Sequence, residues 1–319
     1  MKIHGNEGMP TIFVQVASYR DPDCQWTVKD LFEKAEHPER IRVGICWQFV
    51  EGEDKACFVE PYPYPNHIRL HEVNALVSKG ACWARSVVQK LWNGEDFTLQ
   101  IDSHMRFESG WDEILLSVWN QCNNEKAVVS SYMPGFVPPN VLDRRWIFGM
   151  SAAEFDEDGI LRLKGAPAWP TGGGEPNHPV PGAFVGAAML FGPASIIRDV
   201  PYDPNLYFFG EEISLSVRLW TNGYDIYHPN RLVMFHYWDR SARRTHFEDH
   251  STWREYHNRA VSRIHQMLRT RNTDTSTVAE DLGEYGLGRV RSLADFQQYS
   301  GVDFVQLSFD KKASECNYG

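Results

Sequence analysis

The sequence predicts an α/β fold in which helices flank a mainly parallel β-sheet. Short apolar runs alternate with segments of helical periodicity through the first half of the chain, and this alternation is typical of parallel sheets covered by helices. The chain has 319 residues, of which 42% are hydrophobic, so it can bury one sizeable core. We therefore expect a single domain over residues 1–319.

Five strand-like runs and three helical segments account for the first half of the chain. The run at 11–17 carries almost no charge, whereas helical segments place apolar residues three or four positions apart, as with Leu31, Phe32 and Ala35. The expected strands cover residues 11–17, 41–49, 68–73, 97–101 and 127–132, and the expected helices cover residues 24–36, 81–92 and 111–123.

The middle of the chain breaks this pattern. Proline and glycine are dense between residues 134 and 181, and this stretch is too long for a plain connector, so we expect a functional or partly mobile region there. Regular structure is expected again further on. Apolar spacing predicts order at 183–191, a helix at 211–221, a strand at 231–237 and an amphipathic helix at 250–268 with Ser251 as its N-cap.

The bulk composition argues against several classes of protein. The net charge is −10, whereas a nucleic-acid binder needs a basic face to gain affinity through counterion release. The first residues lack the pattern of a signal peptide, and apolar windows such as 182–192 are too short to cross a bilayer. The six cysteines are scattered and form no C-x-x-C pair, which agrees with a reducing compartment. We expect a cytoplasmic protein with no nucleic-acid partner and no membrane span.

The most informative segment is the apolar run that ends at Asp102. Asp102 and His104 are two positions apart, so in an extended segment their side chains point to the same side. The carboxyl ends of strands are where open α/β sheets bind ligands. A carboxylate oxygen and an imidazole nitrogen suit Mn²⁺, Mg²⁺ or a similar ion. The same triplet could also be a polar turn that caps the strand.

A second apolar run ends at His236. Together with Asp102 and His104, this histidine would complete half of a coordination shell and leave positions open for two phosphate oxygens. Taken alone, a histidine at the end of a strand is commonly a hydrogen-bonded structural residue. Both interpretations remain open at this point.

A basic stretch follows this histidine and contains Arg240, Arg243, Arg244 and His246. A diphosphate leaving group needs positive charge that can close over it, and a loop at this position could supply that charge. The alternative is a solvated basic turn.

Two further segments carry candidate side chains. Glu211 and Glu212 come at the start of a predicted helix, where they could position an acceptor or act as a base, although acidic residues also favour that position through the helix dipole. The Ser18–Asp21 segment follows the first strand and could hold a nucleotide base and ribose, or could be an ordinary turn.

These segments together resemble the polypeptide N-acetylglucosaminyltransferase family, which includes cytoplasmic protein-hydroxyproline GlcNAc-transferases, and more distantly the mucin-type polypeptide GalNAc-transferases. The combination is specific, although no single segment is, and it runs from about residue 11 to residue 304. The matching segments are Ser18-Tyr-Arg-Asp21, Cys82-Trp-Ala-Arg85, Leu99-Gln-Ile-Asp102-Ser-His104-Met-Arg-Phe107, Gly110-Trp-Asp112, Phe209-Gly-Glu-Glu212, His236-Tyr237, Gly283-Glu-Tyr-Gly-Leu-Gly288 and Gly301-Val-Asp303.

The resemblance implies a GT-A fold, a UDP-GlcNAc donor, retention of anomeric configuration, and Mn²⁺ (or Mg²⁺) held by Asp102, His104 and His236. Residues 1–133 would form the nucleotide-binding half, 134–249 the acceptor and metal half, and 250–319 a C-terminal helical extension. The donor-binding residues that it implies are Ser18, Tyr19, Arg20, Asp21, Arg85, Asp102, Ser103, Gly186, Arg243, Arg244 and His246, and the catalytic ones are Glu211 and Glu212.

Several alternatives stay open beside this interpretation. The acceptor could be a protein or a glycan, and the resemblance fixes no oligomeric state. The donor sugar could be GalNAc, glucose or galactose. The same ligand set could serve a module that binds a UDP-sugar without turnover. A metal-dependent hydrolase or nucleotidyltransferase usually needs a second carboxylate cluster, and none is obvious in the sequence.

Overall fold

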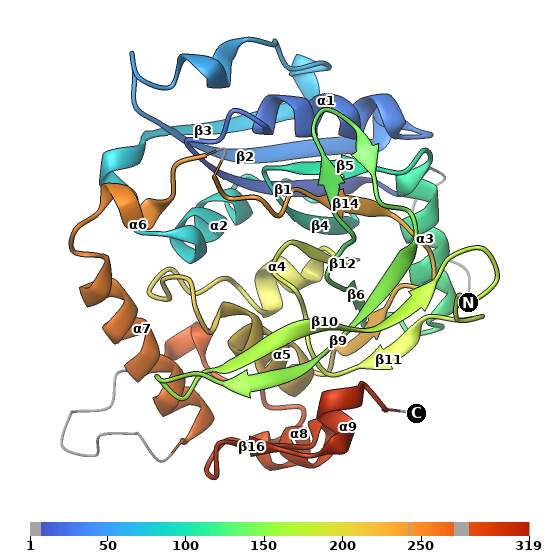
Figure 1. Cartoon of the computed structure of the whole chain (residues 1–319), viewed down its shortest axis with the longest axis vertical. Helices are drawn as coiled ribbons and strands as arrows, with labels where there is room; N and C mark the ends of the chain where they lie inside the picture. Colours follow the sequence, from blue (N-terminus) through green and yellow to red (C-terminus); the bar gives the residue numbers. More distant parts are fainter. Residues whose placement is uncertain (1–7, 242, 271–280, 319) are drawn as a thin grey trace.

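An eight-stranded sheet forms the centre of the computed structural model, which describes residues 8–241, 243–270 and 281–318 (Figure 1). Five of its strands were expected from the sequence, and their bounds agree within a few residues. Its strands, in spatial order, are β11 (Val180–Gly182), β13 (Asp225–His228), β6 (Ala127–Ser130), β12 (Met189–Pro193), β4 (Phe97–Asp102), β1 (Ile12–Tyr19), β2 (Ile41–Phe49) and β3 (Ile68–Asn74).

The direction of the strands determines which loops meet at one edge of the sheet. β1 pairs in parallel with β2 and β4, and β2 pairs in parallel with β3. β12 runs antiparallel to both β4 and β6. Because of this reversal, β12 begins where β4 ends. The residues that precede β12 therefore lie beside the carboxyl end of β4, which is the edge where ligands are expected.

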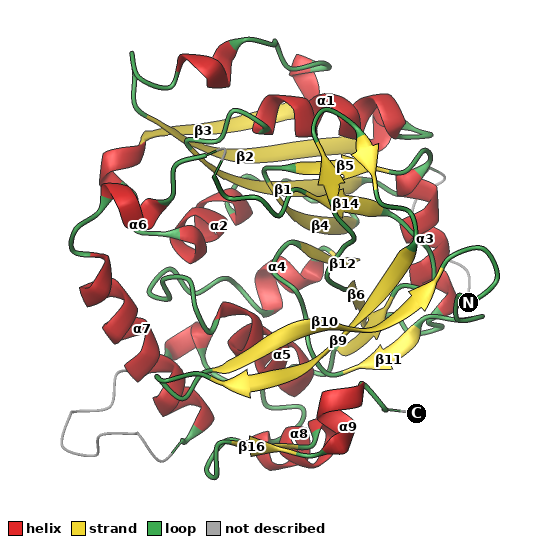
Figure 2. Ribbon diagram, in the orientation of Figure 1, coloured by secondary structure: helices red, strands yellow, loops and turns green. Residues whose placement is uncertain are grey.

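Helices cover both faces of the sheet, as Figure 2 shows. Alternate residues of β1 point to opposite faces: Ile12 and Val14 pack in a core with α1 and α3, whereas Phe13 packs against α2. A separate core lies around α5, α7 and α8. The helices are α1 (Cys24–Lys34), α2 (Ala81–Gln89), α3 (Trp111–Gln121), α4 (Ser195–Asp199), α5 (Glu211–Thr221), α6 (His246–Asp249), α7 (Trp253–Leu268), α8 (Leu293–Ser300) and α9 (Lys311–Glu315).

The expectation of an irregular region between residues 134 and 181 was wrong for much of that region. It contains a long antiparallel hairpin of β9 (Trp146–Phe155) and β10 (Leu161–Pro170), next to a short pair, β7 (Phe136–Val137) and β8 (Val141–Leu142). The register of the hairpin shifts between Gly165 and Ala168. This shift, together with the glycine and proline residues inside the strands, removes the regular alternation that predicts a strand.

Smaller differences concern the ends of elements. The strand expected at 231–237 is only β14 (Met234–His236), which pairs with β5 (Met105–Phe107). The order expected at 183–191 is a loop up to the start of β12. The last long helix, α7, begins after Thr252 rather than after Ser251.

The remaining strands are β15 (Val302–Asp303) and β16 (Ser308–Phe309). Within the described residues, no helix has the length and apolar character that crossing a bilayer requires.

Candidate active site

One cavity of about 320 Å³ lies at the carboxyl ends of β1 and β4. Five segments that are far apart in the sequence contribute side chains to it: the turn after β1, the turn after β4, the loop before β12, the start of α5, and the segment that follows β14. The antiparallel direction of β12 brings the third of these segments to the edge at which the first two end. Carboxylates, imidazoles, guanidinium groups and aromatic rings therefore line the same cavity.

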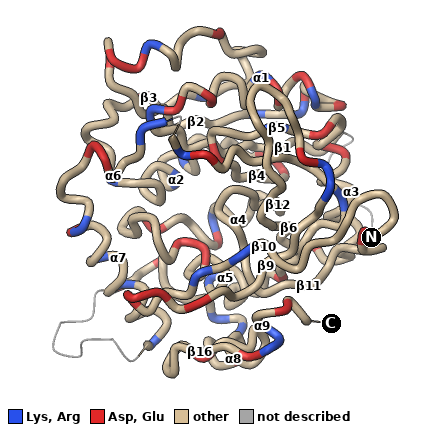
Figure 3. Tube along the Cα trace, in the orientation of Figure 1, with Lys and Arg blue, Asp and Glu red and all other residues tan. Residues whose placement is uncertain are grey.

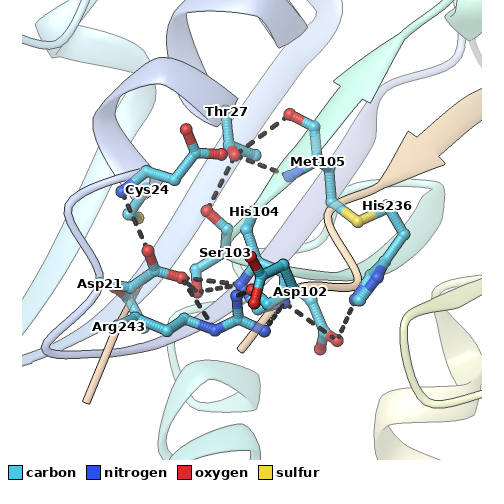
Figure 4. A network of polar contacts seen from close by, with 12 residues as sticks. Asp21, Cys24, Thr27, Asp102, Ser103, His104, Met105, His236 and Arg243 are labelled. Atoms are coloured by element: carbon cyan, nitrogen blue, oxygen red, sulfur yellow. Dashed lines mark hydrogen bonds and ion pairs between the residues drawn. The ribbon is translucent and has the colours of Figure 1, made fainter. Parts of the chain in front are cut away.

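Asp102, His104 and His236 lie together in this cavity, and one ligand atom from each lies within 4.8 Å of the others. Nε2 of His236 is 3.2 Å from Oδ2 of Asp102, and Nε2 of His104 is 3.9 Å from the same oxygen (Figure 4). The β5–β14 ladder explains the convergence, because it sets His236 opposite Met105, the residue after His104. A carboxylate and two imidazoles that face one point can hold a divalent cation.

Asp21 orients His104. Its Oδ2 lies 2.7 Å from Nδ1 of His104 and accepts a hydrogen bond of 2.7 Å from the hydroxyl of Ser103. Burial alone would raise the pKa of Asp21, but the hydrogen bond and the charge of His104 hold it below its usual range. An ionised carboxylate at Nδ1 keeps the ring proton there and leaves the lone pair on Nε2 for a metal. His236 has no such support, since its buried Nδ1 has no hydrogen-bond partner among the described residues.

Arg243 already contacts the nitrogen of His104 that would bind a metal. Its Nη2 donates to Nε2 of His104 at 3.0 Å, and its Nε is 4.0 Å from Oδ2 of Asp21. Figure 4 shows the guanidinium lying against both side chains. Because Nε2 has one lone pair, a cation that binds it must displace this arginine. The displaced guanidinium would then be available, close to the cation, for an anionic ligand.

Arg85 joins Asp102 to a second carboxylate. Its Nη2 donates to Oδ1 of Asp102 at 2.8 Å, its Nε lies 3.0 Å from Oε1 of Glu211, and its Nη1 donates to the carbonyl of Ala187 at 2.7 Å. Burial would raise the pKa of Asp102, but the hydrogen bond from His236 and the charges of Arg85 and His104 hold it well below its usual range. Asp102 is therefore ionised at neutral pH, with Oδ2 directed at the two histidines.

The two glutamates at the start of α5 have different surroundings. Gly210 precedes them with a φ of +86°, and a side chain at this position would collide with Ile264, so the tight entry to the helix requires glycine. Glu211 is only 5% exposed and also accepts a hydrogen bond of 2.7 Å from the hydroxyl of Tyr202. Glu212 accepts bonds from the Ala187 amide at 3.0 Å and from the Tyr132 hydroxyl at 2.6 Å.

Burial raises the pKa of Glu212 from 4.5 to about 7, so this carboxyl can exchange a proton near neutral pH. As the pH rises from 4.5 to about 7, the unfolded chain loses this proton while the native protein keeps it. The free energy of unfolding should therefore fall across that window, by at most about 1.4 kcal/mol per pH unit from this group. Urea denaturation at pH 5.5 and 7.5 measures the fall, and Glu212→Gln should reduce it. An equal fall in the variant would contradict the assignment.

Most residues singled out in the sequence line this cavity, but three do not. Ser18 and Gly186 are buried beside it. Arg20 is 6% exposed, and its guanidinium is paired with Glu53, Asp54 and Asp249 at 2.6 to 3.0 Å, so it links the turn after β1 to the turn after β2 and to α6. The predicted residues that do line the cavity are Tyr19, Asp21, Arg85, Asp102, Ser103, His104, Glu211, Glu212, His236, Arg240, Arg243, Arg244 and His246.

The sequence did not predict all the residues that line the cavity. Tyr132, Arg162, Phe208 and Trp238 also face the cavity. Only Trp238 had a signal in the sequence, because it comes two positions after His236. The other three reach the cavity through tertiary packing of β10 and of the segments that follow β6 and precede α5.

The sequence matches the model of the family "Glycosyltransferase (GlcNAc)" over residues 11–66 and 59–306. The chain belongs to this family. The match covers most of the chain, including every segment that lines the cavity. No curated protein matches the sequence significantly.

Comparison with a solved glycosyltransferase shows that this chain has a GT-A fold. The crystal structure of GalNAc-T7 with UDP, GalNAc and Mn²⁺ superposes with a TM-score of 0.59 at 12% identity, covering 92% of this chain and 55% of that one. This chain thus spans about half the length of GalNAc-T7. The structure of S. aureus TarS 1-349 in complex with UDP-GlcNAc gives a TM-score of 0.49 at 14% identity, with 80% of this chain and 65% of that chain covered. The expected α/β fold of GT-A type is confirmed.

Proposed function

We propose that this glycosyltransferase is a metal-dependent, retaining enzyme that transfers GlcNAc from UDP-GlcNAc to an acceptor hydroxyl. The main support is the convergence of Asp102, His104 and His236 at the carboxyl end of β4, inside the cavity described above. The solved relative that shares the fold holds UDP, GalNAc and Mn²⁺. The family description supports GlcNAc as the sugar.

The three side chains fit a manganese or magnesium ion. One ionised carboxylate and two imidazoles suit a borderline divalent cation, and the Asp21–His104 bond supplies the second-shell support that such sites usually have. An ion bound there would offset the charge of the UDP diphosphate and make UDP a better leaving group. Arg243, Arg244 and His246 line the same cavity and could contact the phosphates or the nucleoside.

The transfer itself exchanges one bond for another. The acceptor oxygen forms a bond with the anomeric carbon, the bond between that carbon and the β-phosphate oxygen breaks, and UDP leaves with the electron pair. Retention requires attack from the face that UDP leaves, or a covalent glycosyl-enzyme formed by a carboxylate. Glu212 is the better placed of the two glutamates, because it is partly exposed in the cavity whereas Glu211 is held by Arg85 and Tyr202.

The cysteines support a reducing, cytoplasmic location. All six are free, and five of them are buried. Burial raises the pKa of the Cys46 and Cys57 thiols to about 12, so these side chains behave as small apolar residues.

Release of UDP from a panel of UDP-sugars, with Mn²⁺ and with EDTA, tests the proposal. We expect metal-dependent release from UDP-GlcNAc, with slower release from UDP-GalNAc, UDP-glucose and UDP-galactose. Slow release without acceptor is expected, because water can replace the missing hydroxyl. Mn²⁺-dependent binding of UDP without any release, even with acceptors present, would instead indicate a binding module. Release of UMP would indicate a nucleotidyltransferase or a hydrolase.

His236→Ala should weaken Mn²⁺ and UDP binding together. The imidazole contributes one of three ligand atoms, and loss of one ligand should lower Mn²⁺ affinity by at least about tenfold. Isothermal calorimetry of UDP binding at fixed Mn²⁺ measures the effect. His67→Ala is a suitable control, since His67 bonds to the Ile41 carbonyl outside the cavity. Unchanged UDP affinity in His236→Ala would assign His236 a structural role only.

A further inference from the structure

Part of the cavity wall carries aromatic rings rather than metal ligands. The rings come from the segment after β6, the turn before α5, α6 and the segment after β14. β10 contributes Leu161, Arg162 and Leu163 beside them. We call this part the aromatic wall; its rings are those of Tyr132, Phe208, Phe209, Trp238 and Phe247.

Two arginines lie on neighbouring rings of this wall. The guanidinium carbon of Arg162 is 4.1 Å from the ring centre of Phe209, and that of Arg240 is 5.9 Å from the ring centre of Phe208. The two phenylalanine rings are perpendicular, with centres 5.1 Å apart. Two guanidinium groups from separate segments are thus each held against one of two neighbouring rings. Cation–π contacts of this kind fix the position of a guanidinium without neutralising it.

Carboxylates lie farther from these two arginines than from other arginines in the cavity. In the described part of the chain, Asp156 is the only carboxylate within ion-pair distance of Arg162, at 3.8 Å, and Arg240 has none. The charge of Arg162 also acts on Glu212, where it opposes the rise in the pKa of that carboxyl. By contrast, Arg85 is bound by two carboxylates, and Arg244 is 3.0 Å from Asp249.

The guanidinium groups of Arg162 and Arg240 belong to a chain whose net charge is −10. Figure 3 marks basic positions on β10, the strand that carries Arg162. An acidic protein repels anionic ligands at long range unless cations are concentrated where the ligand binds. Two guanidinium groups that line a cavity, and whose nearest ion-pair partner among the described residues is 3.8 Å away, are therefore suited to an anionic group. They could bind it by charge-assisted hydrogen bonds.

Trp238 indicates the shape of the ligand. Its side chain is 50% exposed, and its ring centre is 4.1 Å from that of His236 and 6.0 Å from that of Tyr132. Its Nε1 donates to the carbonyl of Met133 at 3.3 Å, so the ring is fixed beside the metal-ligating residues. The C–H face of a pyranose packs well on an indole, because apolar area is buried while the hydroxyl groups point outward. A flat ring suits this surface better than an extended peptide does.

We propose that the aromatic wall binds the acceptor, and that the acceptor is a pyranose bearing a carboxylate or a phosphate. The sugar ring lies on Trp238, and its anionic group contacts Arg162 and Arg240. This inference rests on the proposed transferase function. In the step that it predicts, a hydroxyl oxygen of the acidic sugar bonds to the anomeric carbon of GlcNAc while the bond from that carbon to UDP breaks. The hydroxyl proton passes to the departing phosphate oxygen.

Matched pairs of acceptors test the inference. 4-Nitrophenyl glucuronide is compared with 4-nitrophenyl glucoside, and glucose 6-phosphate with glucose, as the carboxylate and phosphate arms. Binding to the protein–Mn²⁺–UDP complex is measured by calorimetry, and UDP release above hydrolysis gives kcat/KM. At least one charged probe should be preferred about tenfold over its neutral partner, as expected for one charge-assisted contact.

The arginines provide the second half of the test. Arg162→Gln and Arg240→Gln should each reduce, several-fold, the ratio of kcat/KM for the charged probe to kcat/KM for its neutral partner. Arg144→Gln is the matched control, because Arg144 pairs with Glu108 outside the cavity and should leave the preference intact.

Three outcomes would overturn the inference while leaving the transferase function standing. The first is equal binding of charged and neutral sugars to a complex that still binds UDP with Mn²⁺. The second is preference for an acidic serine peptide over every sugar. The third is a loss of UDP affinity in Arg162→Gln or Arg240→Gln, which would place these arginines at the donor. Absence of any Mn²⁺-dependent UDP binding in the unmodified protein would instead refute the proposed function itself.

Discussion

Asp102→Asn should lower metal-dependent UDP release by at least about 100-fold, the size of effect that follows removal of one charged group from a transition-state site. The change removes the only negative charge among the three clustered ligands. The amide oxygen can still accept the bond from Arg85 at the position of Oδ1, so the local structure should be retained. Steady-state UDP release at saturating UDP-GlcNAc and a series of Mn²⁺ concentrations measures the effect.

The same substitution at Asp225 serves as the control. Asp225 lies on β13, is paired with Arg291 at 2.7 Å, and does not line the cavity. Asp225→Asn should leave UDP release within about twofold of the unmodified protein, as is usual for exposed ion pairs. If Asp102→Asn unfolds at the same urea concentration as the unmodified protein and releases UDP at the same rate, the metal assignment is wrong.

Arg85→Met should destabilise the protein by about 3–5 kcal/mol, the typical cost of removing one partner of a buried ion pair. The arginine is 6% exposed and lies between Asp102 and Glu211. Without it, both carboxylates lose the guanidinium that lies between them in a largely desolvated site. The free energy of unfolding, from urea denaturation monitored by tryptophan fluorescence, measures this loss.

Arg40→Met separates stability from function. Arg40 and Asp112 form another buried pair, with atoms 2.6 Å apart, on the side of the sheet where α1 and α3 pack. Its loss should cost a similar free energy, yet Mn²⁺-dependent UDP affinity should persist in the folded fraction. Arg85→Met should lose both, because it also releases the carboxylate that faces the histidines. Equal UDP affinity in the two variants would mean that Arg85 does not position Asp102.

Local pattern was enough to predict much of the fold. The helix at 211–221 and the strand at 41–49 have the bounds that periodicity indicates, since each is amphipathic or apolar throughout its length. The β9–β10 hairpin could not be predicted in this way. Its glycine and proline residues are typical of a loop, and its shifted register breaks the alternation of a strand. Only the pairing between its two ten-residue strands makes it regular.

The part of the candidate site that lies at the ends of strands could be predicted from the sequence. Asp102, His104 and His236 each come at or just after the end of an apolar strand, so their convergence follows from sheet geometry. Arg20 comes just after a strand end too, but three carboxylates from other loops draw its guanidinium away from the cavity. The ion pairs of Arg20 and the position of Arg162 over Phe209 cannot be predicted from local sequence. Both depend on partners far along the chain.

The short ladder between β5 and β14 also governs when the cluster of Asp102, His104 and His236 can form during synthesis. His236 meets Asp102 across 134 positions of sequence, and the link between their segments is a ladder of three residue pairs. A nascent chain that has not yet extended past β14 carries at most two of the three side chains. An ion that needs all three side chains therefore could not assist early folding of the N-terminal half. Binding of such an ion would instead indicate that the segment around His236 has docked, which is a late step.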